Sequence, residues 1–155
     1  MIYAGNAIQV QMHDTRLAKL TFDLKNQSVN TLSAAALIEL KEALEVISNT
    51  SDIKGLMLCS AKSSFIVGAD ITEFLGFFSG DEQDLIDANM QVNATFNVLE
   101  DLAIPSVSLI NGLALGGGFE LALTCDFIIA AKSASLGLVE TSLGLAPLLG
   151  GVQRV

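Results

Sequence analysis

The chain opens with two segments in which apolar residues alternate with polar ones. Ile8, Val10 and Met12 are separated by glutamines, a pattern that predicts a half-buried strand. Residues 17–24 have the composition of a neighbouring strand, and Asp14-Thr15-Arg16 would form the turn between the two. The N-terminal segment therefore predicts a β-hairpin.

Two longer segments carry apolar residues at helical spacing. Ser33 can cap a helix that runs to about Asn49. A second helix is predicted from about Asp84 to Leu102, with Pro105 beyond its end, where proline is tolerated. Their predicted buried faces are Leu37, Leu40, Leu44 and Ile47 in the first helix, and Leu85, Ala88, Val92, Phe96 and Leu99 in the second.

Short continuous apolar runs at residues 53–59 and 107–110 are typical of strands covered on both faces of a parallel sheet. Each run leads into a loop containing glycine and then into a predicted helix, near Ile71 in the first case and from Gly118 to about Thr124 in the second. Further strands are predicted at Phe127–Ala130 and Ser135–Gly137, followed by loops from Val139 and around Pro147–Gly151.

Repeated strand, loop and helix units bring strand ends and helix N-termini to one side of a sheet. We therefore expect Gly68-Ala69 and Gly116-Gly117 to lie side by side. The three consecutive glycines, 116–118, fit either a tight packing turn with a helix cap or a place where a ligand approaches the backbone. The glycine spacing matches neither a dinucleotide fingerprint nor a P-loop, and no serine lies in a nucleophile elbow.

The composition of the chain excludes further classes of function. The 155 residues carry 8 basic and 17 acidic side chains, a net charge of −9, which argues against a nucleic-acid or anionic-membrane surface. Hydrophobic residues make up 51% of the chain and the mean hydropathy is +0.55, yet no apolar run of about 20 residues exists. We therefore expect partner subunits or further sequence to cover apolar surface. The abrupt apolar C-terminus predicts a truncated chain.

The two cysteines, Cys59 and Cys125, lie in apolar runs and are expected to be buried thiols. No metal-ligand spacing is present, and the N-terminus has no signal or transit pattern. A cytoplasmic, reducing location fits these features.

Two kinds of group remain for chemistry. Unpaired N–H groups at two helix starts, brought together, would form an oxyanion hole, for which a thioester carbonyl is a natural ligand. Glu120 and Glu140 lie 20 residues apart and could act as an acid–base pair if they face each other. The alternatives are a helix-cap role for Glu120 and a surface position for both. We interpret Asp70 as a cap and Asp126 as a buried hydrogen-bond or ion-pair partner.

Three motifs carry a family resemblance: residues 65–71 (FIVGADI), residues 111–120 (NGLALGGGFE) and Gly137-Leu138-Val139-Glu140 with Leu143-Gly144. Together they resemble the enoyl-CoA hydratase (crotonase) family. The opening Met-Ile-Tyr and the run continuing to Phe74 are similar to the hydratase/isomerase part of bacterial fatty-acid oxidation α subunits. The resemblance implies an α/β fold of the crotonase type, a spiral of ββα units, with residues 1–155 forming part of the domain and its C-terminal side missing.

The resemblance also implies roles for individual residues. The backbone N–H groups of Ala69 and Gly117 would form the oxyanion hole, Gly68 and Gly116 would contact substrate, and Glu120 and Glu140 would be the catalytic pair. The implied reactions are syn addition of water to a trans-2-enoyl-CoA and Δ3–Δ2 isomerisation of enoyl-CoA. No metal and no cofactor is implied, because coenzyme A is part of the substrate.

Implied partners are the acyl-CoA substrate, further copies of the chain and, in the full-length multifunctional protein, a thiolase subunit. Two departures from the family pattern affect the expected position of Glu140: Val139 stands where proline is common, and the loop reads Pro147-Leu148-Leu149-Gly150-Gly151 where a glycine commonly follows the proline. Two alternatives remain open: a folded fragment without turnover that acts in assembly, and another acyl-CoA reaction on the same fold.

Overall fold

The computed structural model describes residues 1–13, 16–73 and 80–155, so the predicted turn residues Asp14 and Thr15 lie outside the described residues. The strands are β1 (Tyr3–Ala4), β2 (Ile8–Met12), β3 (Leu17–Phe22), β4 (Gly55–Ser60), β5 (Ser106–Ile110), β6 (Leu113–Leu115), β7 (Phe127–Ala130) and β8 (Ser135–Gly137). The helices are α1 (Ala34–Ser48), α3 (Glu82–Glu100), α4 (Gly117–Ala122), the 3-10 helix η1 (Glu140–Leu143) and α5 (Gly151–Arg154).

The main sheet has the strand order β1-β2-β3-β4-β5-β7, and β6 pairs with β8 in a separate two-stranded sheet. The predicted hairpin is present, because β2 and β3 are antiparallel. From β3 onward neighbouring strands are parallel, as the continuous apolar run of β4 predicts. Parallel pairing needs a crossover between strands, and α1 and α3 provide the crossovers before β4 and β5.

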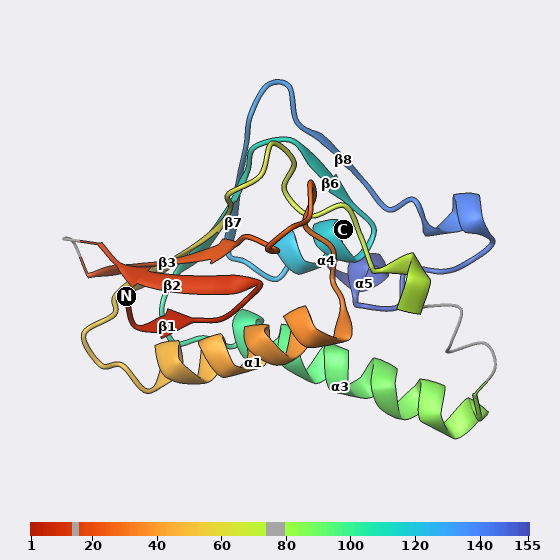
Figure 1. The fold of residues 1–155 in the computed structure, drawn as a ribbon, viewed down its shortest axis with the longest axis horizontal. Coiled ribbons are helices and arrows are strands. Elements are labelled where there is room, and N and C mark those ends of the chain that lie inside the picture. Colours follow the sequence, from red (N-terminus) through yellow and green to blue (C-terminus); the bar gives the residue numbers. More distant parts are fainter. Residues whose placement is uncertain (14–15, 74–79) are drawn as a thin grey trace.

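Helix α1 begins as predicted, with the Ser33 hydroxyl accepting a hydrogen bond from the Ala36 N–H at 3.2 Å. It packs against β2 and α3, and Figure 1 shows α1 and α3 along the same side of the sheet. The buried face of α1 consists of Ala36, Leu40, Ala43, Leu44 and Ile47.

Helix α3 differs from its prediction in one respect. Only the C-terminal part is buried, at Thr95, Phe96 and Leu99, whereas the predicted contacts at Leu85 and Ala88 are only partly buried. Figure 1 shows the N-terminal half of α3 extending beyond the sheet. The apolar spacing is therefore correct, but within residues 1–13, 16–73 and 80–155 no layer covers the first turns of this helix.

Several short elements were not predicted. Strands β1 and β6 contain two and three residues, and η1 and α5 four each, too short for a periodic pattern. Asp126 accepts hydrogen bonds from the Ser106 N–H and hydroxyl, at 2.7 and 2.9 Å. The predicted polar role is present, but Asp126 is exposed and not buried, because β7 lies at the edge of the sheet.

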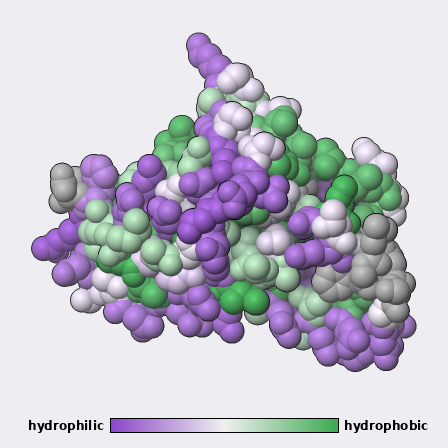
Figure 2. Space-filling model, in the orientation of Figure 1, coloured by the Kyte–Doolittle hydropathy of each residue, from purple (hydrophilic) through white to green (hydrophobic). Residues whose placement is uncertain are grey.

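The hydrophobic core lies between the sheet and the helices, and it includes the fully buried Phe22, Phe65 and Phe96. Apolar side chains after residue 126 are far more exposed: Phe127 at 63% and Leu143 at 67%. Figure 2 shows hydrophobic residues gathered at the surface around β6 and β8, whereas the free end of α3 is hydrophilic. No helix among the described residues is long and apolar enough to cross a membrane.

Candidate active site

The two loops that contain glycine lie against each other. The Leu115 N–H donates to the Ile66 carbonyl at 3.1 Å, and Ile66 forms a parallel bridge with Ala114. A Cβ placed on Gly68 would lie 3.5 Å from the Leu115 carbonyl oxygen. The structure thus brings together the segments around Gly68 and Gly116, which the sequence places 48 positions apart, as predicted.

Hydrogen bonds from Asn30 and Leu32 fix the first of these loops, the one around Gly68. Asn30 is fully buried, and its side-chain amide donates to the Phe65 carbonyl at 3.3 Å and to the Phe22 carbonyl at 3.1 Å. The Leu32 N–H donates to the Gly68 carbonyl at 2.8 Å. Gly68 has φ +113°, a conformation that L side chains rarely adopt. The sequence places glycine where the loop must turn.

Two backbone N–H groups of these loops, those of Ala69 and Gly117, are without a hydrogen bond to the described residues. Gly117 is the first residue of α4, where N–H groups have no partner inside the helix. The backbone therefore offers two unpaired donors on adjacent segments.

The three consecutive glycines serve three different close contacts. A Cβ on Gly116, which has φ +51°, would lie 3.0 Å from a carboxylate oxygen of Glu140. A Cβ on Gly117 would lie 3.2 Å from methyl groups of both Leu32 and Leu149. A Cβ on Gly118 would overlap the Ile66 carbonyl group. The packing explanation holds at Gly118, and Gly116 makes room for the Glu140 carboxylate. Close approach of a ligand to this backbone stays a prediction.

Glu120 is almost completely buried, with 1% of its surface exposed. Its Oε1 accepts hydrogen bonds from the N–H groups of Leu149 and Gly151, each at 2.9 Å. Burial raises the pKa of the Glu120 carboxyl, the two N–H groups lower it, and the charge and hydrogen bonding of Glu140 raise it again, with a net upward shift. A carboxyl group with a raised pKa is suited to proton transfer near neutral pH.

The second carboxyl group, that of Glu140, lies beside the glycine loop. Glu140 is the first residue of η1, and one of its carboxylate oxygens lies close to Gly116. Its Oε2 is buried and has no hydrogen-bond partner among the described residues, which makes it available to a ligand or to a shared proton. The departures at Val139 and Leu148 leave both side chains partly exposed, at 39% and 57%, and Glu140 still lies beside the glycine loop.

The other polar and thiol side chains considered as candidates have contacts or burial that indicate structural roles. The Asp70 carboxylate accepts from the Thr72 N–H and hydroxyl, and these hydrogen bonds lower its pKa, as expected for a helix cap. The Glu73 carboxylate accepts a hydrogen bond from the Ala34 N–H at 2.8 Å. Burial raises the pKa of the Cys59 thiol, and that of Cys125 to about 12, so neither forms a thiolate readily.

Sequence reasoning missed the partners of Glu120. The segment 147–151 was predicted only as a loop, yet it supplies both N–H groups that bind Oε1. The available signal was the Gly150-Gly151 pair, since Gly150 adopts φ +88° and Gly151 lies against Glu120. Among the described residues no group of three or more His, Cys, Asp or Glu side chains could hold a metal ion.

The arrangement combines two unpaired N–H groups, which can bind an oxyanion, with two neighbouring carboxyl groups, which can exchange protons with a substrate. This combination suits reactions at a carbon next to a thioester carbonyl. The profile of the family described as enoyl-CoA hydratase/isomerase matches residues 14–155, and the chain belongs to that family.

Individual relatives agree with this assignment. The chain is 46% identical to the fatty acid oxidation complex subunit alpha of Acinetobacter baylyi, over 100% of this chain and 22% of that protein. An enoyl-CoA hydratase structure from Bacillus anthracis matches with a TM-score of 0.85 and 38% identity, over 96% of this chain and 56% of that one. The structure of DspI from Pseudomonas aeruginosa matches with a TM-score of 0.85 and 31% identity, over 97% and 59%.

These matches confirm the mixed α/β, crotonase-like fold. The chain spans just over half the length of the solved structures and about a fifth of the curated α subunit.

Proposed function

We propose that the protein adds water to trans-2-enoyl-CoA thioesters to give 3-hydroxyacyl-CoA, and that it also interconverts Δ3 and Δ2 enoyl-CoA. One observation carries the proposal: Glu140 lies beside Gly116, Glu120 lies beside Gly117 and interacts with Glu140, and the N–H groups of Ala69 and Gly117 have no protein acceptor among the described residues. Family membership supports the same chemistry.

In the proposed reaction the thioester carbonyl accepts hydrogen bonds from the N–H groups of Ala69 and Gly117. Water forms a bond to carbon 3 while one carboxylate takes up its proton, and the electron pair of the carbon–carbon double bond moves toward the carbonyl oxygen. The N–H groups stabilise the negative charge that develops there. The other carboxyl group then delivers a proton to carbon 2, which restores the thioester.

Glycine at residues 68 and 116 fits the same proposal, because substrate atoms can approach a backbone that has no side chain. For isomerisation, one of the carboxylates would remove a proton from carbon 2 and return a proton to carbon 4. No step in either reaction requires a metal ion or a redox cofactor.

The relatives named as fatty acid oxidation α subunits support a further proposal about context. The chain would act in fatty-acid β-oxidation in the cytoplasm, associate with further copies of itself and, as part of a full-length α subunit, assemble with a thiolase subunit. Sedimentation analysis with and without such a subunit tests the assembly.

The activity is tested by mixing the protein with a short trans-2-enoyl-CoA and following the ultraviolet absorbance of the conjugated thioester. We expect the absorbance to fall and mass spectrometry to show the gain of one water. Binding of the thioester without turnover would favour a folded, non-catalytic assembly module. Turnover without gain of water or movement of the double bond would favour another acyl-CoA reaction.

A further inference from the structure

The segment 147–151, which binds Glu120, is itself held from its outer side by a single cation. Arg154 Nη1 donates to the Leu149 carbonyl at 3.1 Å. The same guanidinium donates through Nε and Nη2 to Glu100 Oε2, at 3.1 and 2.6 Å, and through Nη2 to Asn97 Oδ1 at 2.9 Å. Glu100 and Asn97 lie on α3, so Arg154 connects that helix to the loop.

A second contact from α3 holds the neighbouring peptide. Asn93 Nδ2 donates to the Leu148 carbonyl at 2.9 Å. Two consecutive carbonyl groups of the loop, those of Leu148 and Leu149, are therefore bound on the outer side. The next residue, Gly150, has φ +88°, and the Arg154 guanidinium occupies the space where a Cβ would lie.

The inner side of the same loop faces the candidate site. The N–H groups of Leu149 and Gly151 both bind Glu120 Oε1, whereas Oε2 lies 4.0 Å from the position of a Cβ on Gly117. Leu149 is thus fixed at both ends of its backbone, with its N–H on Glu120 and its carbonyl on Arg154. Displacement of one contact would move the other.

We propose that Arg154 is a positioning residue for Glu120: by holding the segment 147–151 against α3, it keeps two N–H groups on Oε1 and leaves Oε2 beside Gly117. This inference rests on the proposed function only for its effect on catalysis. The guanidinium is suited to the role because its planar fork of donors reaches three acceptors at once, which a lysine ammonium on a flexible stem does not reproduce.

The effect passes through the backbone and not through the charge of Arg154. The cation is paired with Glu100 on the outer side of the loop, and the titratable group that faces Glu120 is Glu140 on η1. The N–H groups of Gly151 and Leu149 lower the pKa of Glu120. Loosening the loop removes that effect, so the Glu120 pKa rises in any variant that loses the geometry, including one that keeps a positive charge.

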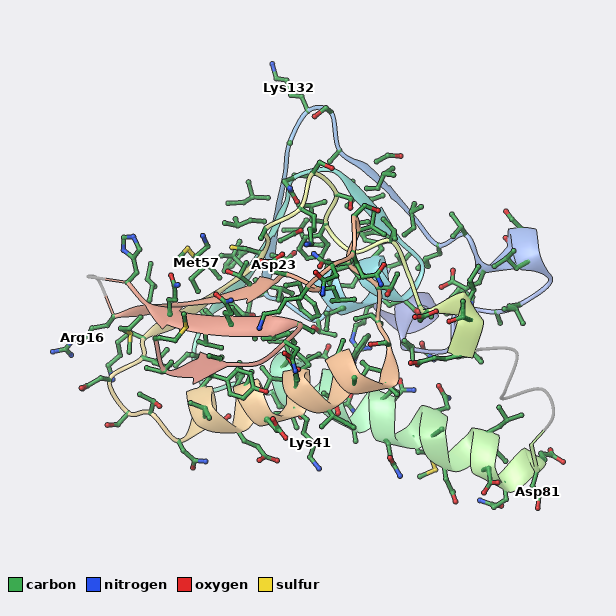
Figure 3. All side chains as sticks on the ribbon, in the orientation of Figure 1. Arg16, Asp23, Lys41, Met57, Asp81 and Lys132 are labelled. Carbon is green, nitrogen blue, oxygen red and sulfur yellow. The ribbon has the colours of Figure 1, made fainter. Side chains whose placement is uncertain are left out.

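The test compares Arg154→Lys and Arg154→Met with Lys132→Met, which removes an exposed cation at the tip of a distant loop (Figure 3). Carboxyl carbon NMR of glutamate-labelled protein follows the titration of Glu120, which Glu120→Gln assigns. We expect the Glu120 midpoint to rise by about one pH unit in both Arg154 variants and to stay unchanged in Lys132→Met. A wild-type midpoint in folded Arg154→Lys would overturn the proposal.

Kinetics provide a second measurement. We expect both Arg154 variants to lose on the order of 10- to 100-fold in kcat, with KM for the enoyl-CoA within about twofold and the acid limb of the pH–rate profile moved to higher pH. A loss confined to KM would contradict the positioning role. If wild-type protein shows no hydration, the proposed function fails, whereas the NMR titration still tests the link between Arg154 and Glu120.

Because an Arg154 variant could lose its fold, Asn97→Leu serves as a milder change that removes one acceptor and leaves the cation. We expect a shift of the Glu120 midpoint in the same direction and of smaller size. Faster hydrogen exchange at the Leu149 and Gly151 amides, with unchanged exchange in β3 and β4, would support the proposal. Unchanged exchange at those two amides in every variant would overturn it.

Discussion

Residues 7–66 and residues 127–155 contain similar proportions of apolar side chains but differ in how the fold covers them. In the first region Phe22 and Phe65 are fully buried in the hydrophobic core. In the second, Phe127 is 63% exposed and Val155 76%. Hydrophobic sequence alone therefore does not define a core, because burial also requires a second layer to pack against.

The candidate site lies at the border between these regions. Glu120 lies on α4, between the two regions in the chain, and is buried, with its Oε1 bound by the N–H groups of Leu149 and Gly151 from the second region. Glu140 belongs to the open region, where none of the four residues of η1 is buried. The position of Glu120 therefore depends on both α4 and the segment 147–151, whereas that of Glu140 depends on the short segment between β8 and α5.

The largest expected effect comes from a pair of phenylalanines in the two regions. Phe22→Ala leaves a cavity in a fully buried site and should lower the free energy of unfolding by about 3–5 kcal/mol. Phe127→Ala removes an exposed ring at the sheet edge and should cost less than about 1 kcal/mol. Urea denaturation measures both. A similar loss in the two variants would show that Phe127 is covered in solution and would remove the contrast.

Substitution of one glycine at a closely packed position and one in the open region should show the same contrast with smaller effects on stability. A Cβ on Gly118 would come within 2.7 Å of the Ile66 carbonyl carbon, so Gly118→Ala should cost about 1–3 kcal/mol through overpacking. A Cβ on Gly137 would make an ordinary contact of 3.7 Å with Val139. Gly137→Ala should therefore stay within about 0.5 kcal/mol of wild type in thermal unfolding. An equal loss in Gly137→Ala would contradict the open structure of that region.

The sequence predicts the features that depend on local periodicity better than the contacts between distant segments. The cap at Ser33, the alternation in β2 and the apolar run of β4 report local periodicity, and those elements form as predicted. The resemblance placed Glu120 and Glu140 near the glycine loops. The hydrogen bonds from Leu149 and Gly151 to Glu120 join residues about 30 positions apart through backbone atoms, so the Gly150-Gly151 pair indicates a special turn but not the residue that this turn binds.

The hydrophobic pattern of the sequence also did not predict which side chains are exposed to solvent. Asp126 is predicted to be buried because apolar residues surround it in the chain, and the first turns of α3 because their apolar residues recur at helical spacing. Whether those neighbours face a core depends on the strand order, and β7 lies at the edge of the sheet. Local sequence carries no information about which strand is last.

The smallest predicted effect is a pH dependence of stability. The pKa of Glu120 is higher in the folded protein than its ordinary value, so the folded state binds the proton more tightly than the unfolded chain. Its contribution is fully present below the unfolded pKa and is lost as pH rises through the folded pKa. Relative to Glu120→Gln, wild-type protein should therefore become less stable as pH rises above about 4.5. Urea denaturation at a series of pH values measures this difference, and the opposite trend would contradict the burial argument.

The central claim is that the two carboxyl groups at this border work together in hydrating an enoyl thioester. The most direct measurement compares kcat for a trans-2-enoyl-CoA in Glu120→Gln, Glu140→Gln and the control Glu45→Gln, which changes an exposed glutamate on α1. We predict a loss on the order of 10²- to 10⁴-fold in each of the first two variants and wild-type kcat in the third. Wild-type turnover in either Glu120→Gln or Glu140→Gln would contradict the account.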